Sequence, residues 1–318
     1  MDSTYVVGID VGGQTSKLGV VDARGAVLAQ TVIRTDTYSE VEPYIAELAD
    51  AVKRIIRESG TEGKVRGIGV GAPNGNYYTG TIENAPNLLW GHERVEFAKL
   101  LSEAMDGLPV ALTNDANAAA VGEMTYGAAR GMKNFIMITL GTGVGSGIVI
   151  NGEVVYGHDG FAGELGHVAA VRNNGRTCGC GKTGCLETYA SATGVARTAR
   201  EWLELTDEPS VLRSLDTIAS KDVYEAAKEG DKLALKIFDF TGKVLGRSFA
   251  DFIAFSSPEA IVLFGGLARA KEFLLGPIEE AMNDNVLPLW RNKVKIVFSQ
   301  LKESDAAILG ASALAWEL

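Results

Sequence analysis

The chain has few cysteines, and no export signal opens it. Its 318 residues contain three cysteines, all within residues 177–187, which read TCGCGKTGCLE. The first residues, MDSTYVVGID, include neither a basic leader nor an apolar run. An odd cysteine count in such a chain argues against a disulfide framework. Metal ligation, a catalytic thiol or inert thiols remain as explanations, and we expect a cytoplasmic protein.

An excess of positive charge and a membrane-spanning run are also lacking. The formal net charge is −10, so the summed field repels nucleic acid and anionic membranes. The longest uncharged stretch, residues 134–152, carries glycine at 141, 143, 145 and 147, which would weaken a membrane helix. We therefore expect small molecules or other proteins as partners, with no nucleic acid and no membrane.

Length and hydrophobic pattern predict two α/β domains. A chain of 318 residues, 46% of them apolar, is long for a single hydrophobic core. Short β-branched runs at 5–9, 17–21 and 26–33, separated by glycine turns, predict a three-stranded meander. Helical patterns at 43–59, 94–105, 193–205, 221–245 and 304–316 alternate with apolar strands at 65–71, 109–113, 259–264 and 294–298. This alternation predicts mostly parallel sheets that begin with an antiparallel meander.

One pattern of strand, glycine turn and strand occurs twice. Shifting the numbering by 129 places VGGQTSKLGVVD, residues 11–22, over LGTGVGSGIVIN, residues 140–151. The alternative is that any two glycine hairpins look alike. The repeat predicts two similar α/β domains, each offering one glycine turn to a shared cleft.

Both glycine turns are suited to hold phosphate. Glycine tolerates positive φ and leaves backbone N–H groups free to surround an anion. The first turn adds Gln14, Thr15 and the cation Lys17, while Asp10 at the strand end suits Mg²⁺. Neither turn has P-loop spacing, and each leads into a strand, which excludes a Rossmann fingerprint. The sequence therefore predicts a polyphosphate clamp built without these motifs.

A polar pair, Asn114 and Asp115, follows an apolar strand. Helix capping alone explains such a pair, because Asn and Asp are favoured N-caps. The functional alternative is that Asp115 lies at the carboxyl end of a strand, where α/β sheets bind ligands. There it could accept the proton of a substrate hydroxyl during phosphoryl transfer.

The cysteines are spaced together with one histidine. His167 precedes Cys178, Cys180 and Cys185 by eleven, thirteen and eighteen residues. Three thiolates and one imidazole complete a tetrahedral zinc shell without an open position, which predicts a structural metal. A redox pair would need two residues between its cysteines, and a catalytic thiol would leave the other two unexplained.

Taken in order, these segments resemble the ROK family of repressors, open reading frames and sugar kinases over nearly the whole chain. The pair GELGH, at 163–167, and CGCG to GCLE, at 178–187, carries the most specific likeness. NDANAAAVGE is similar to the family's catalytic segment, and IVLFGGLA to its strand beside the nucleoside. The resemblance implies the two-domain actin-like ATPase fold of hexokinases and Hsp70 proteins, with mixed sheets, helices and a cleft between the domains.

The resemblance also implies domain bounds and site residues. We expect an N-terminal α/β domain over residues 1–116, completed by a C-terminal helix near 304–318, and a C-terminal α/β domain with the zinc loop over residues 117–303. Asp115 matches the general base that deprotonates the sugar 6-hydroxyl. Sugar-binding positions are Gly71, Asn87, Asn114, Asp115, Glu164, His167 and Glu187. ATP or its phosphates would meet Asp10, Gly12, Gly13, Gln14, Thr15, Lys17, Gly141, Thr142, Gly143, Gly265 and Gly266. His167, Cys178, Cys180 and Cys185 would bind Zn²⁺, and Asp10 would position Mg²⁺.

Two positions depart from the family pattern. Gln14 stands where threonine is usual, so either Gln14 or Thr15 would meet the γ-phosphate. Phe264 stands where a glycine often lies, beside the nucleoside. His167 would have two roles, with one ring nitrogen on zinc and the other donating to a sugar hydroxyl.

The expected activity is that of an ATP-dependent hexose kinase, with glucose as the first choice of sugar. Alternatives are kinases for N-acetylmannosamine, N-acetylglucosamine, fructose or allose, and loops around Tyr77, Asn87 and Glu164 would decide among them. A further alternative is a sugar-sensing regulator of this family without a DNA-binding domain. Repressors of the family carry a helix-turn-helix domain before the first hairpin, whereas here that hairpin starts by residue 7. We expect a homodimer, the commonest closed arrangement.

Overall fold

The computed structural model describes residues 5–318 and divides into two compact units. The first unit takes the chain up to Met132, together with Glu153–Gly163 and Gln300–Leu318. The second consists of Lys133–Gly152 and Glu164–Ser299. Each unit is therefore built from more than one segment, and the division lies elsewhere than the predicted boundary after residue 116.

The first unit is built on a mixed sheet with the strand order β3-β2-β1-β4-β8. Its strands are β1 (Tyr5–Val11), β2 (Thr15–Asp22), β3 (Val27–Arg34), β4 (Val65–Gly71) and β8 (Val110–Thr113). The pairs β1–β2 and β2–β3 are antiparallel, as the predicted meander requires, and β4 and β8 continue in parallel. The predicted strand order of a meander followed by parallel strands is confirmed.

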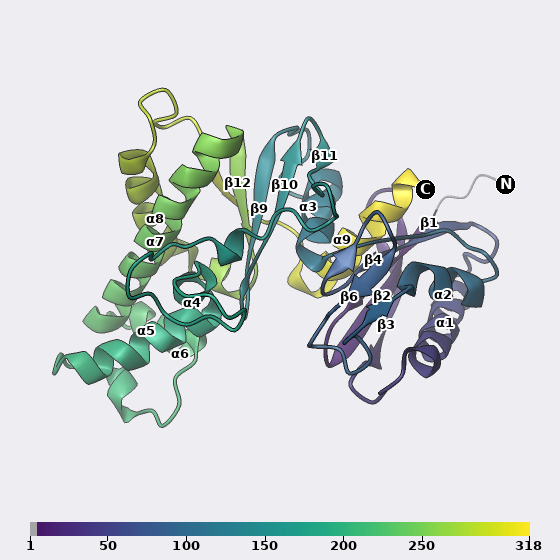
Figure 1. The fold of residues 1–318 in the computed structure, drawn as a ribbon, viewed down its shortest axis with the longest axis horizontal. Helices are drawn as coiled ribbons and strands as arrows, with labels where there is room; N and C mark the ends of the chain where they lie inside the picture. Colours follow the sequence, from purple (N-terminus) through teal and green to yellow (C-terminus); the bar gives the residue numbers. More distant parts are fainter. Residues whose placement is uncertain (1–4) are drawn as a thin grey trace. The chain divides into compact units, whose positions relative to one another are not determined.

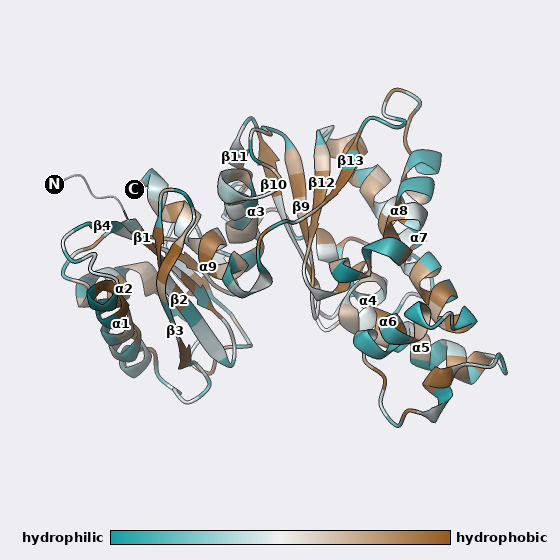
Figure 2. Ribbon diagram, turned by 180° about the vertical axis from the view of Figure 1, so that it is seen from behind, coloured by the Kyte–Doolittle hydropathy of each residue, from teal (hydrophilic) through white to brown (hydrophobic). Residues whose placement is uncertain are grey.

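Helices cover both faces of this sheet (Figure 1). Side chains alternate along each strand, so Val7 and Ile9 share a core with α1 (Val41–Glu58) and α2 (Phe97–Ala104). On the other face Val6 and Val21 pack against Ile308 of α9 (Glu303–Leu314). The buried side chains of α1 recur every three or four residues, and Figure 2 shows the hydrophilic face that this spacing leaves outward.

The second unit repeats the arrangement. Within the unit the strand order is β10-β9-β12-β13, with β9–β10 antiparallel and the other pairs parallel. The strands are β9 (Phe135–Leu140), β10 (Val144–Ile150), β12 (Ala260–Phe264) and β13 (Lys295–Phe298). The strand before the turn ends at Val11 in one unit and at Leu140 in the other, and the next strand begins at Thr15 and at Val144. Both turns thus coincide at the predicted shift of 129 residues, which confirms the repeat.

The helices of the second unit pack on its sheet. They are α4 (Glu187–Ala190), α5 (Ala192–Leu205), α6 (Ser220–Lys228), α7 (Lys232–Ser256) and α8 (Lys271–Asn285), with short 3₁₀ turns η1 (Leu165–His167), η2 (Val211–Ser214) and η3 (Gly266–Ala270). Phe238 and Phe249 of α7 share a core with Ile136 and Ile261 of the sheet. The one helix predicted over 221–245 is wrong, because Gly230 takes a left-handed φ of 82° and ends α6. Asp231 then caps α7 by accepting from the Ala234 backbone N–H at 3.0 Å.

The helix α3 (Asp115–Tyr126) explains why the division differs from the prediction. Ala118 of α3 packs with Ala313 of α9, and a Cβ on Gly122 would lie 2.6 Å from the Cα of Gly310. This close contact between helices assigns α3 to the first unit. The helix α9 belongs to the same unit.

Short elements of the first unit escaped prediction. They are the small sheet of β5 (Gly75–Asn76), β6 (Thr81–Glu83) and β7 (Arg94–Val95), the strand β11 (Glu153–Val154) and the 3₁₀ turn η4 (Ala315–Glu317). Strands of two or three residues are too short to show alternation. Because β7 takes Arg94 and Val95, the helix predicted from residue 94 begins at Phe97 instead. Asn76 holds the segment Glu153–Gly163 in this unit through a 2.8 Å bond from Nδ2 to the Asp159 carbonyl.

Over residues 5–318, none of the helices is both long enough and apolar enough to cross a membrane.

Candidate active site and metal loop

The turn between β1 and β2 opens into a pocket of about 570 Å³ in the first unit. The turn is closed by a 3.1 Å hydrogen bond from the Gly12 N–H to the Thr15 carbonyl. Every first-turn residue predicted to contact ATP lines the pocket, and one predicted sugar residue joins them: Asp10, Gly12, Gly13, Gln14, Thr15, Lys17 and Asn87. The structure therefore brings these predicted residues together around one space.

Gly13 brings the turn close to the loop that carries Asn87. A Cβ on Gly13 would lie 2.8 Å from the Asn87 carbonyl oxygen, closer than such contacts allow. Gln14 is exposed and Thr15 is half-buried, and both line the pocket. Either side chain can therefore reach a ligand held there, as the sequence left open.

Asp10, at the end of β1, has a strongly perturbed carboxyl group. Burial raises its pKa from 3.8 to about 6, the negative charge of Asp115 adds to the rise, and Lys17 opposes it. A half-buried carboxylate that is costly to ionise is a group that a cation would stabilise. The chemistry of this position thus fits a magnesium ion.

Helix capping, one of the two roles considered for Asn114 and Asp115, applies to only one of them. Asn114 is the N-cap of α3, and its Oδ1 accepts from the Asn117 backbone N–H at 2.7 Å. Asp115 is the first residue of the helix and leaves its side chain accessible to solvent. Capping therefore accounts for Asn114 and does not occupy Asp115 in the same way.

The Asp115 carboxylate lies among protein atoms even though solvent reaches it. Desolvation by these atoms raises its pKa, while the Ala116 backbone N–H, 2.8 Å from Oδ1, works in the opposite direction. Gly71 ends the neighbouring strand β4, and a Cβ there would lie 3.6 Å from the Asp115 Cα. Gly71 therefore lies next to the backbone of Asp115, whose carboxylate is accessible and more basic than usual.

The second glycine turn, between β9 and β10, is held by the start of α5. The Gly141 carbonyl accepts from the Ala192 N–H at 2.8 Å, and the Thr142 carbonyl accepts from the Thr193 hydroxyl at 2.7 Å. A Cβ on Gly143 would lie 2.7 Å from Oε2 of Glu187. This turn and a predicted sugar residue are therefore direct neighbours within the second unit.

Gly265 and Gly266 lie at the end of β12, beside the end of β9. Gly265 has a φ of 104°, and a Cβ on it would lie 2.6 Å from the Leu140 carbonyl oxygen. Both facts require glycine at this position. Phe264 pairs with Thr139 of β9 as the last residue of its strand. The predicted nucleoside segment thus lies at the same end of the sheet as the second turn.

The metal-loop residues, His167 with Cys178, Cys180 and Cys185, converge in the second unit. One potential ligand atom from each lies within 4.8 Å of the others. The Sγ atoms of Cys180 and Cys185 are 3.7 Å apart, and the Sγ of Cys178 is 3.8 Å from Nδ1 of His167. Ligands of a tetrahedral zinc ion with Zn–S bonds of about 2.3 Å would be about 3.8 Å apart. The donor set and its spacing fit zinc.

The orientation of His167 separates its two ring nitrogens. Nδ1 faces the cysteines, whereas Nε2 lies 3.9 Å from Oε2 of Glu164. Glu187 Oε1 lies 3.8 Å from Nδ1 and 3.0 Å from the Sγ of Cys178. Two of the predicted sugar residues, Glu164 and Glu187, thus lie beside the third, His167. Its Nδ1 is the nitrogen placed to bind the ion.

Backbone turns give the metal loop its shape. Gly184 has a φ of 80°, and a Cβ there would lie 1.8 Å from the Val171 carbonyl oxygen, so the loop passes there only as glycine. The Cys178 N–H donates to the Lys182 carbonyl at 2.8 Å, and Lys182 Nζ donates to the His167 carbonyl at 2.7 Å. Lys182 therefore ties the cysteine turn to the histidine.

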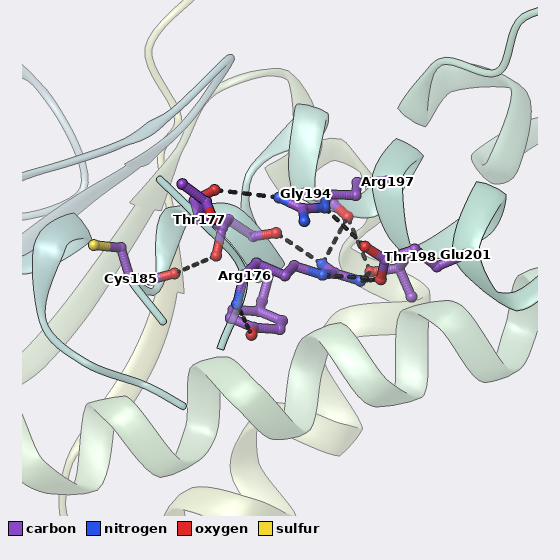
Figure 3. A network of polar contacts seen from close by, with 9 residues as sticks. Arg176, Thr177, Cys185, Gly194, Arg197, Thr198 and Glu201 are labelled. Atoms are coloured by element: carbon purple, nitrogen blue, oxygen red, sulfur yellow. Dashed lines mark hydrogen bonds and ion pairs between the residues drawn. The ribbon is translucent and has the colours of Figure 1, made fainter. Parts of the chain in front are cut away.

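Sequence reasoning missed the buried Arg176, two residues before the first cysteine. Its guanidinium contacts Glu201 and Thr198 of α5, as Figure 3 shows. A basic residue beside the loop was visible in the sequence, but its burial and partners depend on the packing of α5. Such a contact has no local signature.

Comparison with known proteins matches these features. The ROK family model matches residues 6–317. A glucokinase from Halalkalibacterium halodurans is 38% identical over 315 residues, which cover 98% of this chain and 94% of that protein. The crystal structure of a ROK family glucokinase from Streptomyces griseus, in complex with glucose and AMPPNP, has a TM-score of 0.79 and 33% identity, covering 99% of this chain and 100% of that chain. A ROK family transcriptional regulator, a homologue of the E. coli MLC protein, has a TM-score of 0.88 and 27% identity, covering 99% of this chain and 78% of that chain.

The match to the family model extends over almost all of the chain, and the kinase structure aligns along its full length. The predicted α/β fold of the actin-like ATPases is thereby confirmed. The chain belongs to the ROK family.

Proposed function

We propose that this protein is an ATP-dependent sugar kinase, specifically a glucokinase that phosphorylates the sugar 6-hydroxyl. The observation that carries the proposal is the likeness, along the full length of both chains, to a ROK glucokinase that binds glucose and the nucleotide AMPPNP. The 38% identity to a second glucokinase supports the same activity. The geometry within each unit supports the roles given below.

In the first unit Asp115 acts as the general base. Its accessible carboxylate, with a pKa raised by desolvation, accepts the proton of the 6-hydroxyl. The sugar oxygen then forms a bond to the γ-phosphorus, and the bond from that phosphorus to the β,γ-bridging oxygen breaks, releasing ADP. Gly71, Asn87 and Asn114 contribute to the sugar position.

The turn around Gly12 and Gly13 surrounds the phosphates of ATP, with Gln14, Thr15 and Lys17 adding hydrogen bonds and positive charge. Asp10 would position Mg²⁺, which, when bound, neutralises charge on the transferring phosphoryl group. The pocket that these residues line supports the assignment.

In the second unit Glu164, His167 and Glu187 bind hydroxyl groups of the sugar. Gly141, Thr142 and Gly143 contact ATP phosphates, and Gly265 and Gly266 border the nucleoside. Cys178, Cys180, Cys185 and Nδ1 of His167 would hold a structural Zn²⁺, which orders the loop when bound. Nε2 of His167 then remains available to donate to the sugar.

A coupled assay of ADP release, with ATP, Mg²⁺ and a panel of sugars, tests the proposal. Glucose should give the highest kcat/KM, and Asp115→Asn should lower kcat by roughly 10²- to 10⁴-fold with little change in the sugar KM. Asp50→Asn is the matched control, because it makes the same change on the exposed face of α1, outside the proposed site. Turnover of fructose, allose or an N-acetylhexosamine in preference to glucose would refute the glucokinase assignment while keeping a kinase.

The likeness to a ROK transcriptional regulator supports one alternative, a sugar-binding regulator. Sugar binding without any sugar-dependent ADP release would favour it over the kinase. The same panel, followed once by ADP release and once by calorimetric binding, separates the two.

A further inference from the structure

Arg176 makes an unusually complete set of contacts for a buried arginine. Its side chain is only 8% exposed, and its guanidinium lies 4.5 Å from the centre of the Tyr189 ring. Nε and Nη2 both donate to Oε2 of Glu201, at 3.0 and 2.5 Å, and Nη2 also donates to the Thr198 hydroxyl at 2.9 Å. Nη1 donates to the Thr188 carbonyl at 2.7 Å. Donors on all three nitrogens are therefore satisfied inside the second unit.

These contacts join three segments of the chain (Figure 3). Arg176 itself belongs to the metal loop, Thr188 to α4, and Thr198 and Glu201 to α5. The Arg176 backbone N–H also donates to the Tyr189 hydroxyl at 2.8 Å. At the edge of the network Arg197 donates to Oε1 of Glu201 at 2.8 Å. One guanidinium thus holds the loop against both helices.

The position of Thr188 gives this network a consequence for the site. Thr188 follows Glu187 in the first turn of α4, so the bond from Nη1 to the Thr188 carbonyl holds the short helix that begins at Glu187. The Glu187 carboxylate lies beside the metal loop, with Oε1 3.0 Å from the Sγ of Cys178 and 3.8 Å from Nδ1 of His167. Glu187 therefore begins a helix that Arg176 holds, and its carboxylate lies next to the proposed metal ligands.

We propose that Arg176 is a positioning residue that orients Glu187, and with it the sugar, by fastening the metal loop to α4 and α5. This inference rests on the proposed sugar kinase activity. A planar guanidinium is required, because a lysine ammonium cannot donate in the directions of Glu201, Thr198 and Thr188 at once. Hydrogen bonds from Arg197 and Arg176 lower the pKa of Glu201 although burial opposes this, so the acceptor stays ionised at neutral pH.

The network should affect the sugar more than ATP. The second phosphate turn is held by Ala192 and Thr193 at the start of α5. Ser191 caps that helix by accepting from the Gly194 N–H at 3.0 Å. None of these three hydrogen bonds includes Arg176, which reaches the start of α5 through a longer bond of 3.4 Å from Nη1 to the Gly194 carbonyl. Loss of Arg176 should therefore leave this turn in place.

The first experiment compares Arg176→Lys with Arg200→Lys, in the zinc-loaded full-length protein. Arg200 lies on α5, the helix that carries Thr198 and Glu201, and donates to the Ile218 carbonyl at 3.2 Å, so it is a matched control for a lost guanidinium. We expect Arg176→Lys to raise the glucose KM about tenfold, with the ATP KM changed less than about twofold. Arg200→Lys should change neither. Equal effects of the two variants on the glucose KM would overturn the proposal.

A second variant guards against simple misfolding. Glu201→Gln retains the shape of the partner and removes its charge, and it should raise the glucose KM in the same direction. If Arg176 and Glu201 act as one unit, the double variant should be no worse than the more impaired single variant. Fully additive effects, or a fall in active fraction with both KM values unchanged, would show a merely structural role and overturn the inference.

A third measurement is independent of catalysis. The rate at which a chromogenic chelator removes zinc from the protein should be about tenfold faster for Arg176→Lys than for wild type, and unchanged for Arg200→Lys. Unchanged zinc release in Arg176→Lys would contradict the fastening of the loop. If wild type phosphorylates no sugar, the proposed function fails, and faster zinc release would still support the anchoring by Arg176.

Discussion

Replacing Asp10 by asparagine should make the folded protein more stable at neutral pH. Burial and the charge of Asp115 raise the pKa of the Asp10 carboxyl from 3.8 to about 6. Between about pH 4 and pH 6 the folded protein retains a proton that the unfolded chain has already lost. The free energy of unfolding therefore falls as pH rises through this window and stays lowered above it. Asparagine does not ionise, so Asp10→Asn avoids this loss.

The size of the effect follows from the shift in pKa. A pKa change of one corresponds to about 1.4 kcal/mol. Raising the pKa of Asp10 from 3.8 to about 6 therefore lowers the free energy of unfolding by roughly 3 kcal/mol at a pH where the carboxyl is ionised in both the folded and the unfolded protein. The gain from Asp10→Asn should approach this value near neutral pH and vanish below about pH 4. Because Asp115 contributes to the shift, the gain should be smaller when Asp115 is also replaced by asparagine.

Urea denaturation from about pH 4 to about pH 8, in buffer without magnesium, measures this difference. The same variant should lose magnesium-dependent kinase turnover, because the proposed magnesium position requires a carboxylate. Stability would then rise as function falls, a pattern expected of a functional charge. At the acid end of the range the Asp10 carboxyl is neutral, and a neutral carboxyl and an amide should stabilise the protein almost equally. A stability gain of the same size at both ends of the pH range would therefore refute the reasoning.

Three further predictions concern the glycine turn, the helix cap and the metal. Gly143→Ala should raise the sugar KM, because its Cβ would lie 2.7 Å from Oε2 of Glu187. Gly141→Ala should leave the sugar KM unchanged in the same titrations, since its Cβ has no neighbour within 4 Å among the described residues, and a rise equal to that of Gly143→Ala would contradict this. Asn114→Ala should lower the free energy of unfolding by about 1 kcal/mol in urea through loss of the α3 cap, and an unchanged midpoint would show that the cap contributes nothing. Elemental analysis should find one zinc per wild-type chain and less in Cys180→Ser, and wild type well below one zinc would defeat the zinc prediction.

The fold was predictable where patterns are local and repeated. The two glycine hairpins coincide at the predicted offset, because each consists of apolar strands on either side of a turn that needs glycine. The division of the units was less accessible. It depends on the packing of α3 against α9, whose sequences lie about 190 residues apart. Small residues such as Ala118 and Gly122 allow that close contact, but their sequence pattern does not predict it.

The break between α6 and α7 shows a different limit. Apolar spacing continues through 221–245, so periodicity alone predicts one helix. Gly230 and Asp231 carry the stop signal and the cap, and they override the spacing because glycine takes a left-handed φ that helices do not use. These two residues were visible in the sequence, and giving them priority over the apolar pattern would have placed the break.

The metal loop shows how far residue types alone lead toward a site. The spacing of His167 and the cysteines predicted a ligand set, and the structure brings these atoms within 4.8 Å of one another. The spacing could not show which ring nitrogen of His167 faces the metal. Because Nδ1 faces Cys178 and Nε2 faces Glu164, a metal on Nδ1 would leave the proton on Nε2, where it can be donated to a ligand. The metal site, which does not contact the sugar, would then determine which ring nitrogen of His167 donates a hydrogen bond to the sugar.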